Sequence, residues 1–149
     1  MTEAKPDPLD FDVLTANVGV QVHLTRRALW LRAGPSRPKM HAGKPSGYLT
    51  TFIVIGANPG VSQKRLADEL FLDAGSIGDI VDTLEREDMV ERRRDPADRR
   101  RLNLFLTDHG RAEWLRLRAK SAEIDRGMTG ALTEAEVEQL LELLKRLRG

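Results

Sequence analysis

The feature that most constrains the fold is a pair of short helices joined by a tight turn. An N-P-G turn at residues 58–60 precedes Ser62, which is a typical helix N-cap. We expect this first helix to end near Leu70, because Asp73 supplies the N-cap of a second helix. Two short helices in this arrangement indicate a helix-turn-helix. The second helix carries an apolar stripe at i, i+3, i+4 and i+7, formed by Ile77, Ile80, Val81 and Leu84.

A β-hairpin with a charged tip is predicted directly after these helices. Residues 89–94 and 100–107 alternate in the manner of strands around D-P-A-D at 95–98, where a proline and two short acids suit a turn. We expect Leu102, Leu104 and Leu106 to share one face and to close the core over the helices. The arginine-rich tip would then project into solvent as a wing.

The charge and composition of the chain limit its partners. The net charge is only +1, so the distribution of charge matters more than its sum, and the run R-R-R-D-P-A-D-R-R-R at 92–101 is strongly basic. A length of 149 residues with 40% apolar and 32% charged residues predicts one soluble domain. The absence of cysteine fits a reducing compartment, and no run approaches the ~20 apolar residues of a membrane span. We therefore expect a cytoplasmic protein with no membrane contact.

The residues before the helix pair predict one helix, one loop and one segment of undecided type. An apolar stripe from Phe11 to Leu29 predicts a first helix over residues 10–31. Residues 34–47 hold three prolines and three glycines and are expected to form a loop. The apolar run at 48–57 could be a buried strand or a buried helix, and its periodicity does not decide between them.

The residues after the hairpin predict two helices with an uncovered apolar stripe. The first spans about residues 108–127, and the second begins at Thr133, where T-E-A-E forms a capping box with Glu136. A stripe at the chain end must bury itself against the first helix, the preceding helix or a second copy of the chain, and a helical dimer is the economical solution. This stripe consists of Val137, Leu140, Leu141, Leu144 and Leu147.

Three stretches resemble, in order, the helix, recognition helix and wing of the MarR (multiple-antibiotic-resistance regulator) family. They are N-P-G-V-S-Q-K-R-L-A-D-E-L at 58–70, I-V-D-T-L-E-R-E-D-M-V-E-R-R at 80–93, and D-P-A-D-R-R-R-L-N-L-F-L-T-D-H-G at 95–110. The resemblance implies a mainly α fold with a small β-hairpin wing, in which residues 48–57 are helical. It implies a single domain over residues 1–149, with a winged helix-turn-helix lobe at 48–107 and dimerisation helices at 10–31 and 108–148.

The resemblance also implies a DNA-binding transcriptional regulator, expected to be a repressor that binds a pseudo-palindromic double-stranded operator as a homodimer. Asp98 resembles the aspartate that holds the wing through an arginine pair, and Arg100 resembles the arginine that enters the minor groove. A guanidinium on a stiff hairpin suits the negative potential of a narrow groove. The expected DNA-binding residues are Ser62, Gln63, Ser76, Asp79, Arg86, Arg94, Arg99, Arg100 and Arg101.

Two acids on the recognition helix leave its role open. Asp79 and Asp82 lie opposite the apolar stripe, where carboxylates facing phosphates would oppose binding. Asp79 could accept a hydrogen bond from a cytosine amino group, and Ser76 could contact a base or a phosphate. Alternatively, these acids are plain surface residues or pair with the arginines of the wing.

A small aromatic acid or phenolic compound is the expected effector, because MarR regulators are usually controlled by small molecules. Rings would cover its apolar body while an arginine binds its anion. In the alternative reading, Trp30 and Phe52 belong to the core and the arginines to the surface. The candidate ligand-binding residues are His23, Arg26, Arg27, Trp30, Tyr48 and Phe52.

The sequence gives no indication of an enzyme, a cofactor or a metal site. His23, His41 and His109 lie on separate elements, and none pairs with another histidine or a carboxylate at metal-ligand spacing. The G-S-I-G stretch at 75–78 lacks the G-x-S-x-G spacing of a nucleophile elbow. The rival hypothesis is a winged helix that has become a protein-interaction module and no longer reads DNA.

Overall fold

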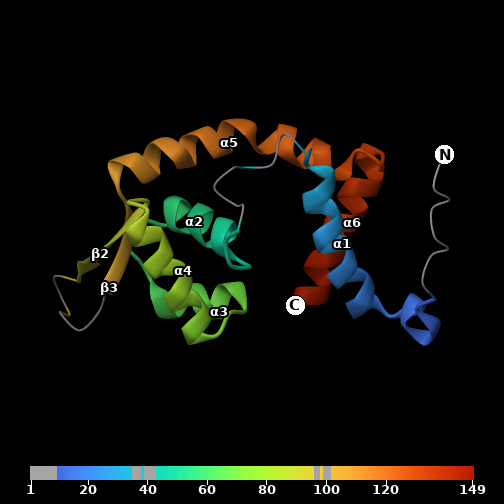
Figure 1. Cartoon of the computed structure of the whole chain (residues 1–149), viewed down its shortest axis with the longest axis horizontal. Coiled ribbons are helices and arrows are strands. Elements are labelled where there is room, and N and C mark those ends of the chain that lie inside the picture. The colour runs from blue at the N-terminus through green and yellow to red at the C-terminus, as the bar shows by residue number, and fades with distance from the viewer. Residues whose placement is uncertain (1–9, 35–37, 39–42, 96–97, 99–101) are drawn as a thin grey trace, which may run out of the picture. The chain divides into compact units, whose positions relative to one another are not determined.

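The computed structural model describes residues 10–34, 38, 43–95, 98 and 102–149, with the elements labelled in Figure 1. Contacts divide the chain into two compact units. The terminal unit consists of Met1–Ser36 and Ile124–Gly149, and the central unit of Arg37–Glu123. No helix in the described ranges is long and apolar enough to cross a membrane.

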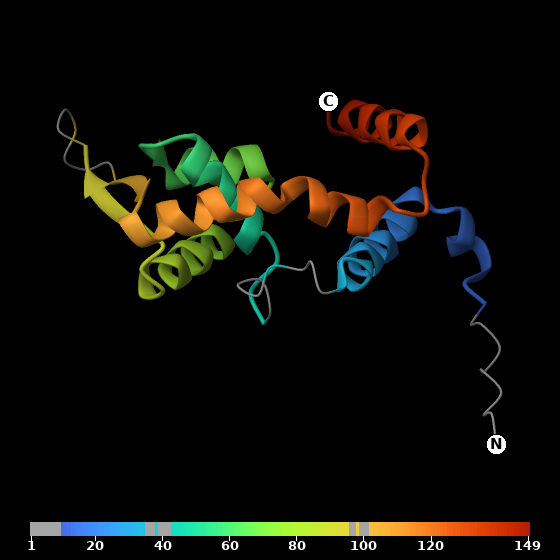
Figure 2. The same ribbon diagram turned by 90° about the horizontal axis from the view of Figure 1, so that it is seen from above.

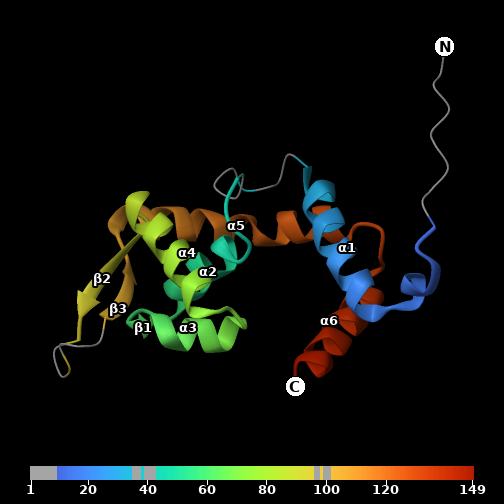
Figure 3. The ribbon, with the colours of Figure 1, turned by 60° about the horizontal axis from the view of Figure 1, so that its bottom comes forward.

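The central unit is a winged helix-turn-helix. Its three strands form an antiparallel sheet in the order β1-β3-β2, in which Leu104 of β3 lies opposite Val61 of β1 and Arg92 of β2 (Figure 3). The run at 48–57 is a helix, as the family resemblance implied, and β1 adds a strand that was not predicted. The elements are α2 (Tyr48–Ala57), β1 (Val61–Ser62), α3 (Gln63–Leu70), α4 (Ala74–Arg86), β2 (Val90–Arg94), β3 (Leu102–Leu106) and the first part of α5 (Asp108–Thr129).

Both helices of the pair begin at the predicted caps. The Ser62 side chain accepts a hydrogen bond from the Arg65 backbone N–H at 3.2 Å, and Asp73 accepts one from the Ser76 N–H at 2.8 Å. Each bond satisfies an N–H that the first turn of a helix leaves without a partner. The turn between the helices places Phe71 in the left-handed region, at φ 53 and ψ 41.

The core of the central unit lies between α2, α3, α4 and the sheet. Leu102, Leu104 and Leu106 alternate along β3 as predicted, but they close the core only in part, because Leu104 is fully buried while Leu102 is 44% exposed. Leu102 pairs with Arg94 at the far end of the hairpin, where the strands extend beyond the helices. The most deeply buried side chains are Tyr48, Thr51, Phe52, Ile55, Leu66, Ile77, Ile80, Val81, Leu84 and Leu104.

Helix α5 packs closely on α2 within the central unit (Figure 2). The indole N–H of Trp114 donates to the Ile53 carbonyl oxygen at 3.1 Å. A Cβ at Gly56 would lie 2.3 Å from the same indole nitrogen, so only glycine fits this crossing.

The terminal unit contains a short 3₁₀ helix (Asp12–Ala16), α1 (Val18–Arg32), the end of α5 and α6 (Glu134–Arg148). The single helix predicted over residues 10–31 is therefore interrupted at Asn17. The extended backbone of Asn17 lets its side chain accept a hydrogen bond from the Val20 N–H at 3.1 Å, which starts α1 anew. The predicted capping box of Thr133 and Glu136 is confirmed.

Candidate DNA-binding surface

The N-terminal end of α4 is exposed and made of small residues. The Ser76 hydroxyl donates to the Asp73 carboxylate at 2.6 Å, so both side chains hold the first turn of the helix. Hydrogen bonds from the hydroxyl and the backbone N–H of Ser76 lower the pKa of Asp73. A helix that begins with Ala74 and Gly75 can bring its backbone close to another molecule.

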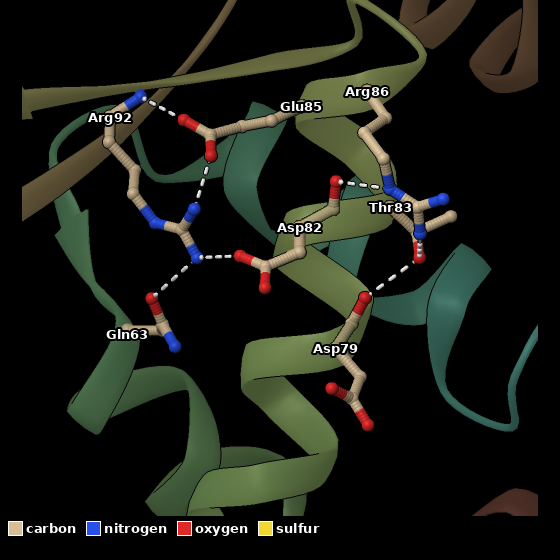
Figure 4. A network of polar contacts seen from close by, with 7 residues as sticks. All are labelled: Gln63, Asp79, Asp82, Thr83, Glu85, Arg86 and Arg92. Carbon is tan, nitrogen blue, oxygen red and sulfur yellow. Dashed lines mark hydrogen bonds and ion pairs between the residues drawn. The ribbon is translucent and has the colours of Figure 1, made fainter.

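Arg92 of β2 ties the wing to both helices of the pair (Figure 4). Its Nη2 atom donates to the Asp82 carboxylate at 2.7 Å and to the Gln63 amide oxygen at 3.2 Å. Its Nη1 atom and its backbone N–H both donate to the Glu85 carboxylate. The Arg92 side chain is only 20% exposed, so its charge serves an internal contact between α3, α4 and β2.

The contacts of Arg92 distinguish the two acids on α4, Asp79 and Asp82. Asp82 pairs with an arginine at the base of the wing, as the alternative interpretation held. Asp79 points away from Arg92, and its carboxylate has no hydrogen bond or ion pair among the residues that the structure describes (Figure 4). The recognition helix therefore presents one unneutralised acid rather than two.

Arg86 lies along its own helix. Its Nη2 atom donates to the Thr83 hydroxyl at 2.8 Å, and its Nε atom donates to the Asp82 carbonyl at 3.3 Å (Figure 4). Contacts to i−3 and i−4 hold the guanidinium near the C-terminal end of α4, although it is exposed. Its predicted contact with DNA would require these bonds to be exchanged.

The described part of the wing is held by local contacts. The Arg93 guanidinium stacks 4.7 Å from the centroid of the Phe105 ring, and the Asn103 amide donates to the Asp95 carboxylate at 3.0 Å. Arg94 is exposed at the end of β2, and the backbone N–H of Asp98 donates to Asp95 at 3.4 Å. The predicted contacts of Arg99, Arg100 and Arg101 lie outside the described residues.

A hollow of about 590 Å³ lies between the start of α3 and the far end of the hairpin strands, where Asp95, Leu102 and Asn103 line it. Two predicted DNA-binding residues, Ser62 and Gln63, line it together with two cations, Lys64 and Arg65. Exposed cations beside a helix N-terminus suit a phosphate group, because the N-terminal amides carry partial positive charge. The structure thus brings Ser62 and Gln63 together with the far end of the hairpin strands on the central unit.

The candidate ligand-binding residues are divided between the two units. Tyr48 and Phe52 are fully buried in the central unit, which is the core role that the alternative reading gave to Phe52. His23, Arg26 and Arg27 are exposed on α1, and Trp30 is partly buried. The predicted pocket stays a prediction.

The sequence reasoning missed a second polar cluster, formed by Lys44, Tyr48 and Glu87. The Tyr48 hydroxyl and the Lys44 ammonium both donate to the Glu87 carboxylate, and Lys44 lies 5.5 Å from the centroid of the Tyr48 ring. Burial and the adjacent carboxylate raise the pKa of Tyr48. Glu87 is the C-cap of α4, so the cluster fastens residues before α2 to the end of the recognition helix. No motif indicates this cluster, because its members come from two segments that are far apart in the sequence, residues 44–48 and residue 87.

The described ranges contain no candidate metal-binding site. No group of three or more histidine, cysteine, aspartate or glutamate side chains is placed there to hold an ion.

The sequence is similar to those of known transcriptional regulators. A MarR family model matches residues 45–101. The chain is 35% identical over 101 residues to the HTH-type transcriptional regulator BilQ of Clostridium symbiosum, covering 68% of this chain and 70% of BilQ. It is 34% identical over 96 residues to the HTH-type transcriptional regulator TtmR of Methylorubrum extorquens, covering 64% and 48%. The chain spans 48% to 70% of the length of the first three curated relatives that it matches.

Solved structures share the fold. The PcaV transcriptional regulator from Streptomyces coelicolor, in complex with its natural ligand, gives a TM-score of 0.77 at 24% identity, covering 96% of this chain and 97% of PcaV. The transcriptional repressor CouR, bound to a 23-mer DNA duplex, gives a TM-score of 0.75 at 24% identity and covers 96% and 100%. At 24% identity, these similarities show that the chain shares the fold of PcaV and CouR.

Proposed function

Since this chain belongs to the MarR family of transcriptional regulators, we propose that it represses transcription by binding a pseudo-palindromic operator as a homodimer. The observation that carries the proposal is the combination of an exposed, small-residue start of α4 with a basic hairpin that Arg92 holds beside it. The DNA-bound structure of CouR, which has the same fold, supports it. The protein would act in the cytoplasm on chromosomal DNA.

Different parts of the surface contact different features of the DNA. Ser62 and Gln63, beside Lys64 and Arg65, contact the phosphate backbone and set the position of the protein, whereas Ser76 and Asp79 face base edges in the major groove. Arg86 can contribute only after leaving its contacts on α4. Arginine and lysine side chains that contact phosphates or enter a groove supply most of the affinity for DNA. In this proposal the wing cations are Arg94, Arg99, Arg100 and Arg101, with Asp98 holding the hairpin.

The homodimer is supported by the apolar face of α6. Leu140 is 39% exposed, Leu141 51% and Leu147 68%, although all three belong to one helical stripe. A stripe of this kind on a helix of a single chain calls for a partner surface. A two-fold dimer would place its recognition helices on half-sites one helical turn apart.

A small aromatic acid or phenolic effector completes the proposal, and the ligand complex of PcaV supports control by a small molecule. The residues of α1 that would bind it are His23, Arg26, Arg27 and Trp30. An effector can release DNA only through different affinities for the bound and free geometries, and a coupling of about 1–3 kcal/mol changes operator affinity about 5- to 150-fold. Titrating a panel of aromatic acids, with tryptophan fluorescence and DNA release as readouts, tests this part.

The test of DNA binding uses the wing. Arg100→Ala should weaken binding to the DNA upstream of the chain's own gene and leave the melting temperature unchanged. The slope of log K against log salt should fall by about 0.9 for each lost contact, or about twice that in a symmetric dimer. Arg116→Ala, which removes an exposed cation from α5, is the matched control.

Two outcomes would count against the proposal. An unchanged affinity and salt slope for Arg100→Ala would reject the role of the wing. No mobility shift by the unmodified protein at any salt concentration would reject DNA binding and favour the protein-interaction module.

A further inference from the structure

Phe71 is the most unusual residue of the helix-turn-helix. It lies in the turn between α3 and α4, two residues before the Asp73 cap, and its side chain is 77% exposed. Its backbone has φ 53 and ψ 41, a conformation that glycine adopts readily and a bulky residue adopts only at a cost. A strained backbone that holds a large apolar ring in water does not stabilise the chain, and such outliers cluster at functional sites.

Small residues follow Phe71 at the start of α4, so few long side chains there would keep its ring from contacting another molecule. Ala74, Gly75, Ser76 and Gly78 occupy the first turns of α4. The fold does not require glycine at 78, because a Cβ there would meet only the Gln63 amide nitrogen, at the ordinary contact distance of 3.6 Å. Two glycines weaken a helix, so their presence fits a close approach of this backbone to another molecule.

We propose that Phe71 is a specificity-determining residue that contacts a thymine methyl group in the major groove of the operator. This inference rests on the proposed DNA-binding function. The start of α4 would approach the bases closely, and the ring of Phe71, adjacent in the chain, would cover the methyl group that distinguishes thymine from cytosine at C5.

The chemistry of the contact is apolar. The C5 methyl group of thymine is the apolar feature of the major groove, and phenylalanine is among the side chains that contact it. The ring excludes water from the methyl group and needs no hydrogen-bond partner. The Ser76 hydroxyl oxygen and the Asp79 carboxylate can accept hydrogen bonds from other base edges, so the two kinds of readout do not overlap.

The first part of the test removes the methyl group from the DNA. The operator is located by footprinting on the DNA upstream of the chain's own gene, and each thymine of a half-site is replaced in turn by deoxyuridine. We expect one position at which the unmodified protein loses affinity about four-fold per half-site, the effect of exposing one buried methyl group, and therefore about 15-fold when both half-sites are changed.

The second part changes the protein at two residues with similar backbones. Asp88 is exposed in the turn after α4 and has φ 54, so Asp88→Gly relieves a similar conformation and serves as the control for Phe71→Gly. Both variants should melt at or above the temperature of the unmodified protein. Only Phe71→Gly should bind the thymine operator about 15-fold more weakly, and it should bind the deoxyuridine operator with no further loss.

The outcomes are distinguishable. If the unmodified protein binds DNA but Phe71→Gly binds it equally well, or if the losses from Phe71→Gly and deoxyuridine simply multiply, the role of Phe71 is refuted while the proposed function stands. If the unmodified protein binds no DNA, the proposed function fails and the inference fails with it.

Discussion

At the scale of single residues, Arg92 is the side chain on which the arrangement of the wing depends most. We predict that Arg92→Gln lowers the free energy of unfolding by about 1.5–3 kcal/mol, because it leaves the carboxylates of Asp82 and Glu85 without their charged donor. Chemical denaturation measures this. Operator affinity should also fall, since two uncompensated acids would then add negative charge close to the proposed DNA-binding surface.

A matched variant separates this network from ordinary surface charge. Arg116 makes an exposed ion pair with Glu113 on α5, so Arg116→Gln should change stability by less than about 0.5 kcal/mol. Equal effects of the two substitutions would show that the Arg92 network contributes no more than a surface pair.

Glu87 gives a prediction that depends on pH. Burial alone would raise its pKa, but hydrogen bonds from Lys44 and Tyr48 lower it, and the net pKa lies below its ordinary value of 4.5. The stability that this carboxylate contributes is therefore complete above its unfolded pKa and is lost as the pH falls through the folded pKa. Tyr48→Phe should lower the free energy of unfolding by about 1.5–3 kcal/mol at neutral pH and by less when Glu87 is protonated.

Denaturant melts of the two proteins at a series of pH values, from neutral to below the lowered pKa of Glu87, measure this difference. Phenylalanine fills the buried space of the tyrosine ring, so packing is preserved. A difference in stability that stays constant over this range would contradict the link to Glu87.

The residues show where sequence reasoning stops. The caps at Ser62, Asp73 and Thr133 were predicted correctly, because each bond joins residues three apart in the chain. The pairing of Asp82 with Arg92 remained one of two alternatives, because it depends on how β2 lies against α4. Periodicity held a hint, since Arg92 is two residues from the buried Val90 and so shares its face of the strand.

At the scale of elements, the start of α5 is fixed by its close approach to Met89, the residue before β2. A Cβ at Gly110 would lie 1.9 Å from the carbonyl oxygen of Met89, which is backbone and cannot rotate away. We predict that Gly110→Ala lowers the free energy of unfolding by at least about 3 kcal/mol, because the helix or the strand must move. Thermal or chemical denaturation measures the loss.

The same change from glycine to alanine at residue 78 should raise the free energy of unfolding rather than lower it. Gly78 lies within α4, and a Cβ there would make only an ordinary contact with Gln63, so Gly78→Ala should raise stability by about 0.5–1 kcal/mol through helix propensity. A mild effect of Gly110→Ala, similar in size to that of Gly78→Ala, would contradict the close packing of α5 against the backbone of Met89.

Elements were predicted well where local signals are strong and poorly where tertiary contacts decide. Helix α4 has the predicted cap and the predicted buried stripe. The break at Asn17 was missed, because a helix pattern with apolar residues on both sides hides a single cap in its interior. Strand β1 is two residues long and exists only through its pairing with β3, which leaves no periodicity to detect.

At the scale of the whole molecule, the exposed stripe of α6 predicts a dimer. Replacing Leu141 and Leu147 by glutamate should dissociate it, because charges at a buried interface lose their hydration. Light scattering at micromolar concentration measures the mass of both proteins. A well-behaved monomer formed by the unmodified chain would contradict the prediction and would remove the reason to expect a palindromic operator.

Arg92 is turned toward the acids of α4, and Asp79 keeps an unneutralised charge on that helix. Both features affect how strongly non-specific chromosomal DNA competes with the operator for the protein. Random genomic sequence competes for a regulator mainly through phosphate contacts, and an acidic recognition helix weakens that competition. We expect little of the protein to be sequestered away from its target. A small number of copies per cell would then suffice to keep the operator occupied.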